Sequence, residues 1–156
     1  MPRPAHLLAP ILLSLVSSAC GAELASREAS PAGLPFAFAV HDCAPWDGPA
    51  VTIYLTPTAG SGSTPLSWPH VRVSVWRAAE TLPGSSFSWP SDTQVGVAAR
   101  CTGPDDCVQA NRGRIRFRAH EPDGMLAGFT ELTFADGTRL EGGFRAVLGR
   151  SRAFCG

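Results

Sequence analysis

The sequence predicts an all-β protein, folded as a single antiparallel β-sandwich or flattened barrel of about seven to nine strands. Apolar residues recur at every second position in a series of short segments after residue 35, as in strands with one buried face. Turn residues separate these segments. The chain also holds 16 glycines and 14 prolines, so no long helix is expected.

The expected strands follow one another along the chain, with irregular stretches between some of them. Apolar residues alternate over residues 36–40, 51–55, 71–75, 95–99, 115–117, 126–134 and 140–144. Residues 57–67 are rich in Gly, Ser, Thr and Pro and predict a long mobile loop. Residues 78–93 predict a second irregular stretch.

The register of the first C-terminal hairpin follows from its turn residues. Residues 121–124 read Glu-Pro-Asp-Gly, in which the proline favours a turn and the glycine allows a positive φ. A four-residue loop here places Ile115 and Phe117 on the same face as Leu126 and Leu132. We therefore expect this face to be buried.

The next turn, over residues 135–137, allows two registers. A two-residue Asp-Gly turn would turn the apolar residues of the last strand outward, because a slip of one residue reverses every side chain. A type I turn with a glycine bulge instead pairs Phe134 with Thr138 and places Phe144 opposite Gly128. Burial favours the bulged turn, in which Gly128 leaves room for the Phe144 ring.

This register leaves a row of arginines on the outer side of the sheet. They are Arg112, Arg114, Arg116 and Arg118 on one strand, with Arg139 and Arg145 on a neighbouring strand. Glu131 and Glu141 share that face, so six arginines against two glutamates give a local charge near +4. We expect Arg114 to bridge the two glutamates, and Arg116 to form a cation–π contact with Phe129.

Two interpretations of these arginines stay open. In the first, they bind an anionic glycan, a lipid headgroup or an acidic protein, because the arginine fork suits phosphate and carboxylate groups. In the second, they form a solvated strand face in a chain that has no lysine to supply positive charge.

The first 21 residues have the layout of an export signal. Arg3 precedes an apolar run of about ten residues, 7–16, whereas spanning a bilayer takes about 20. Small residues then lead to Cys20, preceded by Ala19 and followed by Gly21.

This segment resembles the lipobox of bacterial lipoproteins, and the resemblance covers residues 1–21 only. It implies a signal peptide over residues 1–19, acylation of Cys20 with chains such as palmitate, and a membrane anchor. Because Gly21 is not the aspartate of an inner-membrane retention signal, the resemblance favours the outer membrane or cell surface. Plain secretion or a periplasmic location, after cleavage behind Ala19 or Ala22, is the alternative. Residues 20–34 predict a flexible tether and residues 35–156 the folded domain.

Four cysteines remain if Cys20 is acylated, and four allow three pairings. We favour Cys101 with Cys107, which enclose a turn-rich segment, and Cys43 with Cys155, which tie the first strand to the chain end. An oxidising compartment favours disulfides over a metal site.

The residues that catalysis or metal binding would require are missing or are scattered along the chain. Without lysine, Schiff-base chemistry and a Walker phosphate site are excluded. The chain after the signal has a net charge near −1, which implies no nucleic-acid partner. The histidines are dispersed, and no G-x-S-x-G motif is present. We therefore expect no metal, no cofactor and no enzyme.

Three classes of function remain. The first is a non-catalytic envelope lipoprotein that binds an anionic ligand through the arginines. The second is a structural or assembly lipoprotein that uses a sheet edge, and the third is a small secreted hydrolase. The tryptophans (Trp46, Trp68, Trp76 and Trp89) either fill the core or stack on sugar rings.

Overall fold

The computed structural model describes residues 30–156, apart from residues 64, 91–94, 123, 152 and 156. Within this part of the chain it has eight strands and one short 3₁₀ helix, which confirms the all-β prediction. The strands are β1 (Phe36–Cys43), β2 (Pro49–Thr56), β3 (His70–Val75), β4 (Ser86–Trp89), β5 (Gly96–Cys101), β6 (Cys107–Phe117), β7 (Met125–Phe134) and β8 (Arg139–Leu148). The 3₁₀ helix is η1 (Ala79–Thr81).

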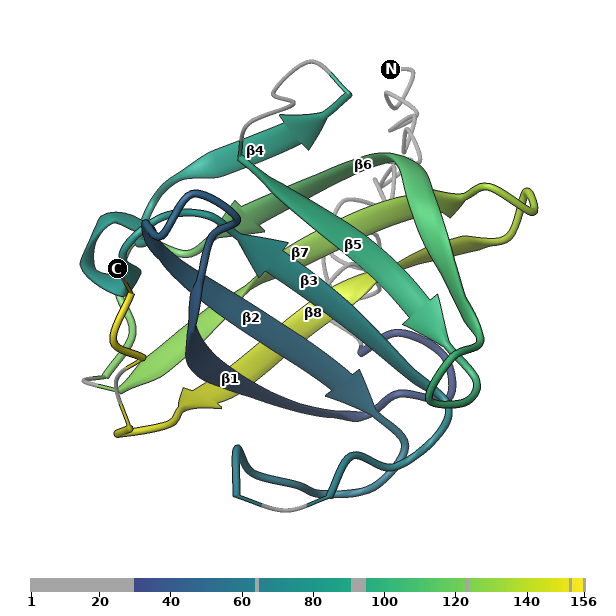
Figure 1. Cartoon of the computed structure of the whole chain (residues 1–156), viewed down its shortest axis with the longest axis horizontal. Helices are drawn as coiled ribbons and strands as arrows, with labels where there is room; N and C mark the ends of the chain where they lie inside the picture. Colours follow the sequence, from purple (N-terminus) through teal and green to yellow (C-terminus); the bar gives the residue numbers. More distant parts are fainter. Residues whose placement is uncertain (1–29, 64, 91–94, 123, 152, 156) are drawn as a thin grey trace, which may run out of the picture.

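Seven of these strands close into a barrel rather than a sandwich. The order runs β6-β5-β3-β2-β1-β8-β7, and the pairing of β6 with β7 closes the ring. In Figure 1, β1, β2, β3 and β5 form the face toward the viewer, with β7 and β8 behind them. One pairing departs from the expected antiparallel pattern, because β1 runs parallel to β8, with Phe38 opposite Val147.

Strand β4 lies outside this ring. It pairs with β6 between Ser86 and Trp89, on the edge of β6 that β5 leaves open after Gln109. The sequence predicted no strand here. The stretch does alternate, because Phe87 and Trp89 pack against the core while Ser86 and Ser88 lie on the other side of the strand.

The registers predicted for the two C-terminal hairpins are confirmed. Phe117 pairs with Gly128 across β6 and β7, and the Phe134 N–H donates to the Thr138 carbonyl oxygen at 2.9 Å. Gly137, in the bulged turn, has a φ of 83°, which glycine adopts without a steric penalty. Ile115, at 0% exposure, therefore lies in the core, and the alternate arginines lie outside.

The faces suggested by the alternation in the first and fifth strands are wrong. In β1, Ala39 lies opposite Ile53 and faces the core, whereas Phe38 lies opposite Tyr54 on the outer side of the barrel, where it is covered to 5% exposure. In β5, Ala98 faces the core and Val97 is 40% exposed. The reason is steric, since the narrow barrel accepts alanine on these strands and the larger side chains lie outside.

Both favoured disulfides are present. Cys101 and Cys107 are directly paired residues at the turn between β5 and β6. Cys43, at the end of β1, bonds to Cys155, which fastens the C-terminal segment to the barrel. The end of the expected tether also packs on the barrel, because Pro31 and Leu34 are buried.

Candidate functional site

The outer surface of β6, β7 and β8 carries the predicted arginines and is called here the arginine face. Its members are Arg112, Arg114, Arg116, Arg118, Arg139 and Arg145, and all six are exposed. They point outward because the residues between them on β6, Ile115 and Phe117, are buried in the core. Strand alternation therefore spreads the positive charge over one continuous surface.

The neighbours of these arginines match the prediction in part. The guanidinium of Arg116 lies 5.7 Å from the centre of the Phe129 ring, in cation–π geometry. Glu131 is the residue opposite Arg114 on β7. The expected bridge from Arg114 to two glutamates is not formed. Instead, the Arg114 Nε donates to the Ser88 Oγ of β4 at 3.3 Å.

A third acidic residue on this face, Glu121, is not among those that the strand alternation predicts. It lies 3.2 Å from an Arg145 nitrogen and 3.8 Å from an Arg118 nitrogen. Counting Glu121 with Glu131 and Glu141, six arginines against three glutamates leave a local charge near +3 rather than +4. Glu121 partly neutralises the end of the face that holds Arg118 and Arg145. Glu131 and Glu141 lie in line with Arg114 toward the other end.

An open groove of about 580 Å³ runs over the outer side of β6 at that end. It is lined by Ser88, Trp89, Pro90, Arg112, Gly113, Arg114, Glu131 and Thr133. Gly113 lies between the two arginines on β6, and its missing side chain leaves room on the inner side of the strand for Trp89 and Leu132. A Cβ at Gly113 would lie 3.0 Å from the Trp89 ring and 2.8 Å from Leu132. Close packing under Gly113 therefore sets the floor of the groove.

The arginines could be predicted from the sequence, but the wall that faces them could not. Ser88 and Trp89 come from β4, which lies beside β6 only because of the fold. The Ser-Phe-Ser-Trp alternation was the one signal that could have indicated this strand.

The four tryptophans lie in three different environments. Trp89 is buried in the core cluster. Trp46 and Trp76 contact each other edge to face at a centroid distance of 4.9 Å, and Trp46 is 53% exposed. Trp68 lies over His70 at 4.5 Å and is 39% exposed. Two of the aromatic groups are therefore accessible to a ligand.

The other features considered from the sequence are the export signal, a metal site and a membrane-spanning segment. Cys20 and the export signal lie outside the described residues. Within the described residues, no three His, Cys, Asp or Glu side chains are grouped so that they could hold a metal ion. No helix of that same part of the chain is long and apolar enough to cross a membrane.

Comparisons with family models, curated proteins and solved structures found no match.

Proposed function

We propose that this protein is a non-catalytic binding module of the cell envelope, which holds a phosphate or carboxylate group in the groove of the arginine face. The observation that carries the proposal is that Arg112 and Arg114 line one groove, with the Ser88 hydroxyl on its other wall. Guanidinium groups bind such anions through paired, charge-assisted hydrogen bonds. The chemistry suits a charged glycan or a lipid headgroup.

The groove also favours a ligand with an apolar part beside its charge. Trp89 and Pro90 line it next to the arginines and supply apolar surface there. A bare inorganic anion would meet only the arginines. A headgroup or a charged sugar would use both kinds of contact.

The location in the envelope is part of the same proposal. The two disulfides point to an oxidising compartment, outside the cytoplasm. The lipobox-like sequence at Cys20 would supply the anchor. Intact mass spectrometry of the exported protein tests it, because acylation adds the mass of the fatty chains to a protein that begins at Cys20.

The sheet-edge alternative has less support. Among the described strands, β4 alone is paired on one side only, and it is four residues long. Closing a barrel removes the free edges through which sheets associate. The groove therefore supports the binding module more directly.

The test is a binding measurement with a matched control. An unacylated Cys20→Ser protein is titrated with phosphatidylcholine vesicles with and without phosphatidylglycerol, and with polygalacturonate, a carboxylated glycan without lipid. We expect one of the two anionic probes to bind, and Arg112→Gln with Arg114→Gln to weaken it at least about tenfold.

The control is Arg77→Gln with Arg150→Gln, which removes the same charge from exposed positions outside the groove. It should leave binding nearly unchanged. Equal losses in both double variants would indicate bulk charge rather than a site, and failure of both anionic probes to bind would contradict the proposal.

A further inference from the structure

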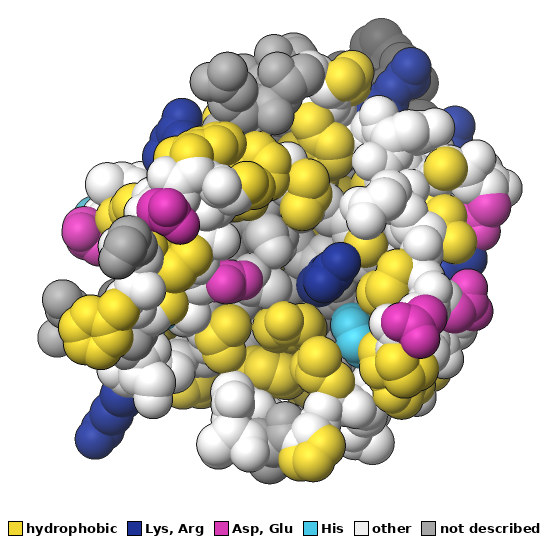
Figure 2. Space-filling model, in the orientation of Figure 1, with side chains coloured by type: hydrophobic (Ala, Val, Ile, Leu, Met, Phe, Trp, Pro, Cys, Tyr) yellow, Lys and Arg dark blue, Asp and Glu magenta, His cyan; other side chains and the backbone are white. Residues whose placement is uncertain are grey.

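The outer surface of β1, β2, β3 and β5, called here the front face, carries a second group of polar and aromatic side chains. Figure 2 shows one acidic and one basic side chain near the centre of this face, with a histidine beside the basic one and hydrophobic side chains around a shallow hollow. None of these side chains belongs to the arginine face, which lies on the other side of the barrel.

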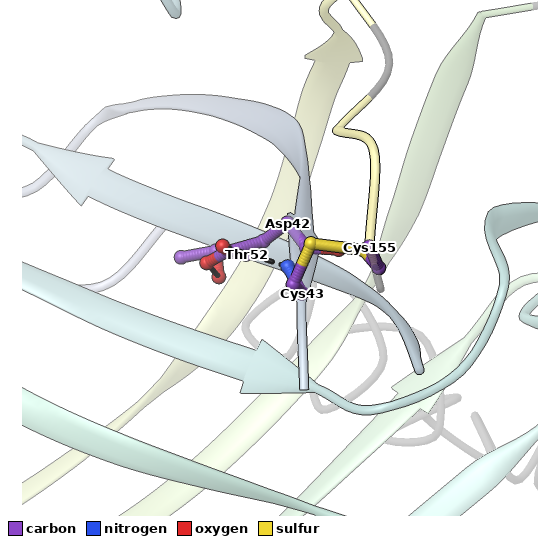
Figure 3. Close-up of a disulfide and its surroundings, with 4 residues drawn as sticks. All are labelled: Asp42, Cys43, Thr52 and Cys155. Carbon is purple, nitrogen blue, oxygen red and sulfur yellow. Dashed lines mark hydrogen bonds between the residues drawn. A yellow bond between two sulfur atoms is a disulfide. The ribbon is translucent and has the colours of Figure 1, made fainter. Parts of the chain in front are cut away.

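The acidic group on this face, Asp42, is held in place by two hydrogen bonds. Its Oδ2 accepts from the Thr52 hydroxyl at 2.7 Å, and its Oδ1 accepts from the backbone N–H of Cys43 at 2.8 Å (Figure 3). The neighbouring disulfide, Cys43 to Cys155, fixes the end of the same strand. Asp42 itself is exposed, so its remaining lone pairs face solvent in a fixed orientation.

A chain of hydroxyls continues from this carboxylate toward β3. The Thr52 Oγ1 lies 2.7 Å from the Ser74 Oγ, and Thr52 is only 1% exposed. Thr52 has a single hydroxyl proton, which it gives to Asp42, so Ser74 must donate to Thr52. The Ser74 oxygen is then left as an acceptor. Asp42 and Ser74 together offer hydrogen-bond acceptors to a ligand that carries hydroxyl donors.

The donor on this face is Arg72. It lies two residues before Ser74 on β3, on the same side of the strand, and is half-buried. Burial raises the pKa of the Tyr54 phenol, the Asp42 charge raises this pKa further, and the Arg72 charge opposes the rise. The charges of Asp42 and Arg72 therefore both reach the Tyr54 phenol, and they shift its pKa in opposite directions.

Aromatic rings stand at both ends of this polar group. At one end, Trp68 lies over His70, which meets the Tyr54 ring edge to face at 5.7 Å. At the other end, the exposed Trp46 contacts Trp76, which directly follows β3. Fixed polar groups between accessible aromatic rings are the usual make-up of a small-molecule site.

We propose that the front face binds a neutral hexopyranose, with the sugar ring against Trp68 or Trp46 and its hydroxyls bonded to Asp42, Ser74 and Arg72. The hydroxyls supply the donors that Asp42 and Ser74 require, and a sugar oxygen accepts from Arg72. One negative and one positive side chain give no net attraction for an anion. This site is therefore independent of the anion groove and uses none of its residues.

The test uses saturation-transfer NMR on the full-length Cys20→Ser protein with four neutral probes: methyl α-glucoside, methyl α-mannoside, methyl β-galactoside and N-acetylglucosamine. At least one should receive saturation from the protein. Asp42→Asn keeps an oxygen for the Thr52 hydroxyl but removes the charge, and we expect it to weaken binding about tenfold or more. Trp68→Ala and Trp46→Ala show which ring carries the sugar, and one of them should weaken binding similarly.

Arg112→Gln with Arg114→Gln serves as the control, because it disables the anion groove and should leave sugar binding unchanged. Absence of saturation transfer to all four sugars would overturn the inference. So would binding that survives Asp42→Asn and both tryptophan variants, or binding that only the arginine variant removes. Failure of the anion proposal leaves these results unaffected, because the two sites use different probes and residues.

Discussion

Gly128 and Phe144 lie opposite each other on β7 and β8, and the Phe144 ring occupies the space that a side chain at position 128 would need. A Cβ at Gly128 would lie 2.9 Å from the Phe144 Cζ and 2.1 Å from the backbone oxygen of Arg116. The absence of a side chain on β7 therefore lets the ring pack inside the barrel, where Phe144 is 5% exposed.

The first prediction follows from this contact. Gly128→Ala should lower the free energy of unfolding by about 3 kcal/mol or more, because the methyl meets backbone that cannot move independently of the sheet. Gly103→Ala is the control, since its Cβ would meet only an ordinary contact at 3.8 Å. Urea unfolding of both variants measures the difference. A Gly128→Ala protein as stable as the control would show that the strands can separate here at little cost.

A second prediction concerns the acidic wall of the anion groove. Glu131 lies opposite Arg114 and lines the groove with it. Its negative charge opposes an anionic ligand, so Glu131→Gln should strengthen binding of the anionic probe a few-fold, by about 0.5–1 kcal/mol. Titration in low salt checks this, and Glu80→Gln, which removes an exposed charge in η1, is the control. Weaker binding in Glu131→Gln would mean that the glutamate contacts the ligand favourably.

The third prediction compares the two disulfides. They close segments with sequence separations of 112 and 6 residues. If disulfides act mainly on the entropy of the unfolded chain, their contributions are about 4.8 and 2.2 kcal/mol, respectively. Paired serine variants at Cys43 and Cys155, and at Cys101 and Cys107, should therefore differ in urea unfolding, with the first pair less stable. The reverse order would show that local packing around the short loop contributes more to stability than chain entropy does.

The fourth prediction is a pH dependence that arises from His70. Burial lowers the pKa of this imidazole below 6.5, its ordinary value, although its hydrogen bond with the Ser67 carbonyl oxygen opposes the shift. The unfolded chain then takes up the proton at a higher pH than the folded protein does. The contribution of His70 to stability is complete above about pH 6.5, and it is lost as the pH falls toward the folded pKa.

Two measurements check this dependence. Titration of the His70 ring protons by NMR should give a midpoint below 6.5. Stability measured by urea unfolding should fall between neutral and mildly acidic pH, and His70→Asn should reduce that fall. A ring that titrates above its ordinary value would reverse the sign of the effect and contradict the prediction.

The strand register of the C-terminal half of the barrel could be predicted from the sequence because the two faces of its strands differ chemically. Arginines alternate with Ile115 and Phe117 on β6, so only one orientation buries apolar side chains and leaves charges in water. The same requirement selected the bulged turn at Gly137. The disulfide pairs were likewise limited to three arrangements, and the turn-rich segment between Cys101 and Cys107 favoured the one that is formed.

The buried faces of the N-terminal strands could not be predicted in the same way, because both faces of these strands carry apolar or aromatic residues. Phe38 stacks on Tyr54 outside the barrel at a centroid distance of 5.1 Å, while the small Ala39 faces the core. Alternation cannot distinguish these two faces, since each buries hydrophobic surface. The interior volume of the closed barrel decides between them, and that volume is a property of the whole fold.

The sequence by itself determined the strand-rich fold, the outward orientation of the arginines and the pairing of the C-terminal hairpins, because these depend on residues close together in the chain. Only the tertiary structure decided that β1 pairs in parallel with β8 and that β4 lies beside β6 to complete the anion groove. It also decided that Asp42, Thr52 and Ser74 share one face. These contacts join distant segments, and closure of the ring brings them together.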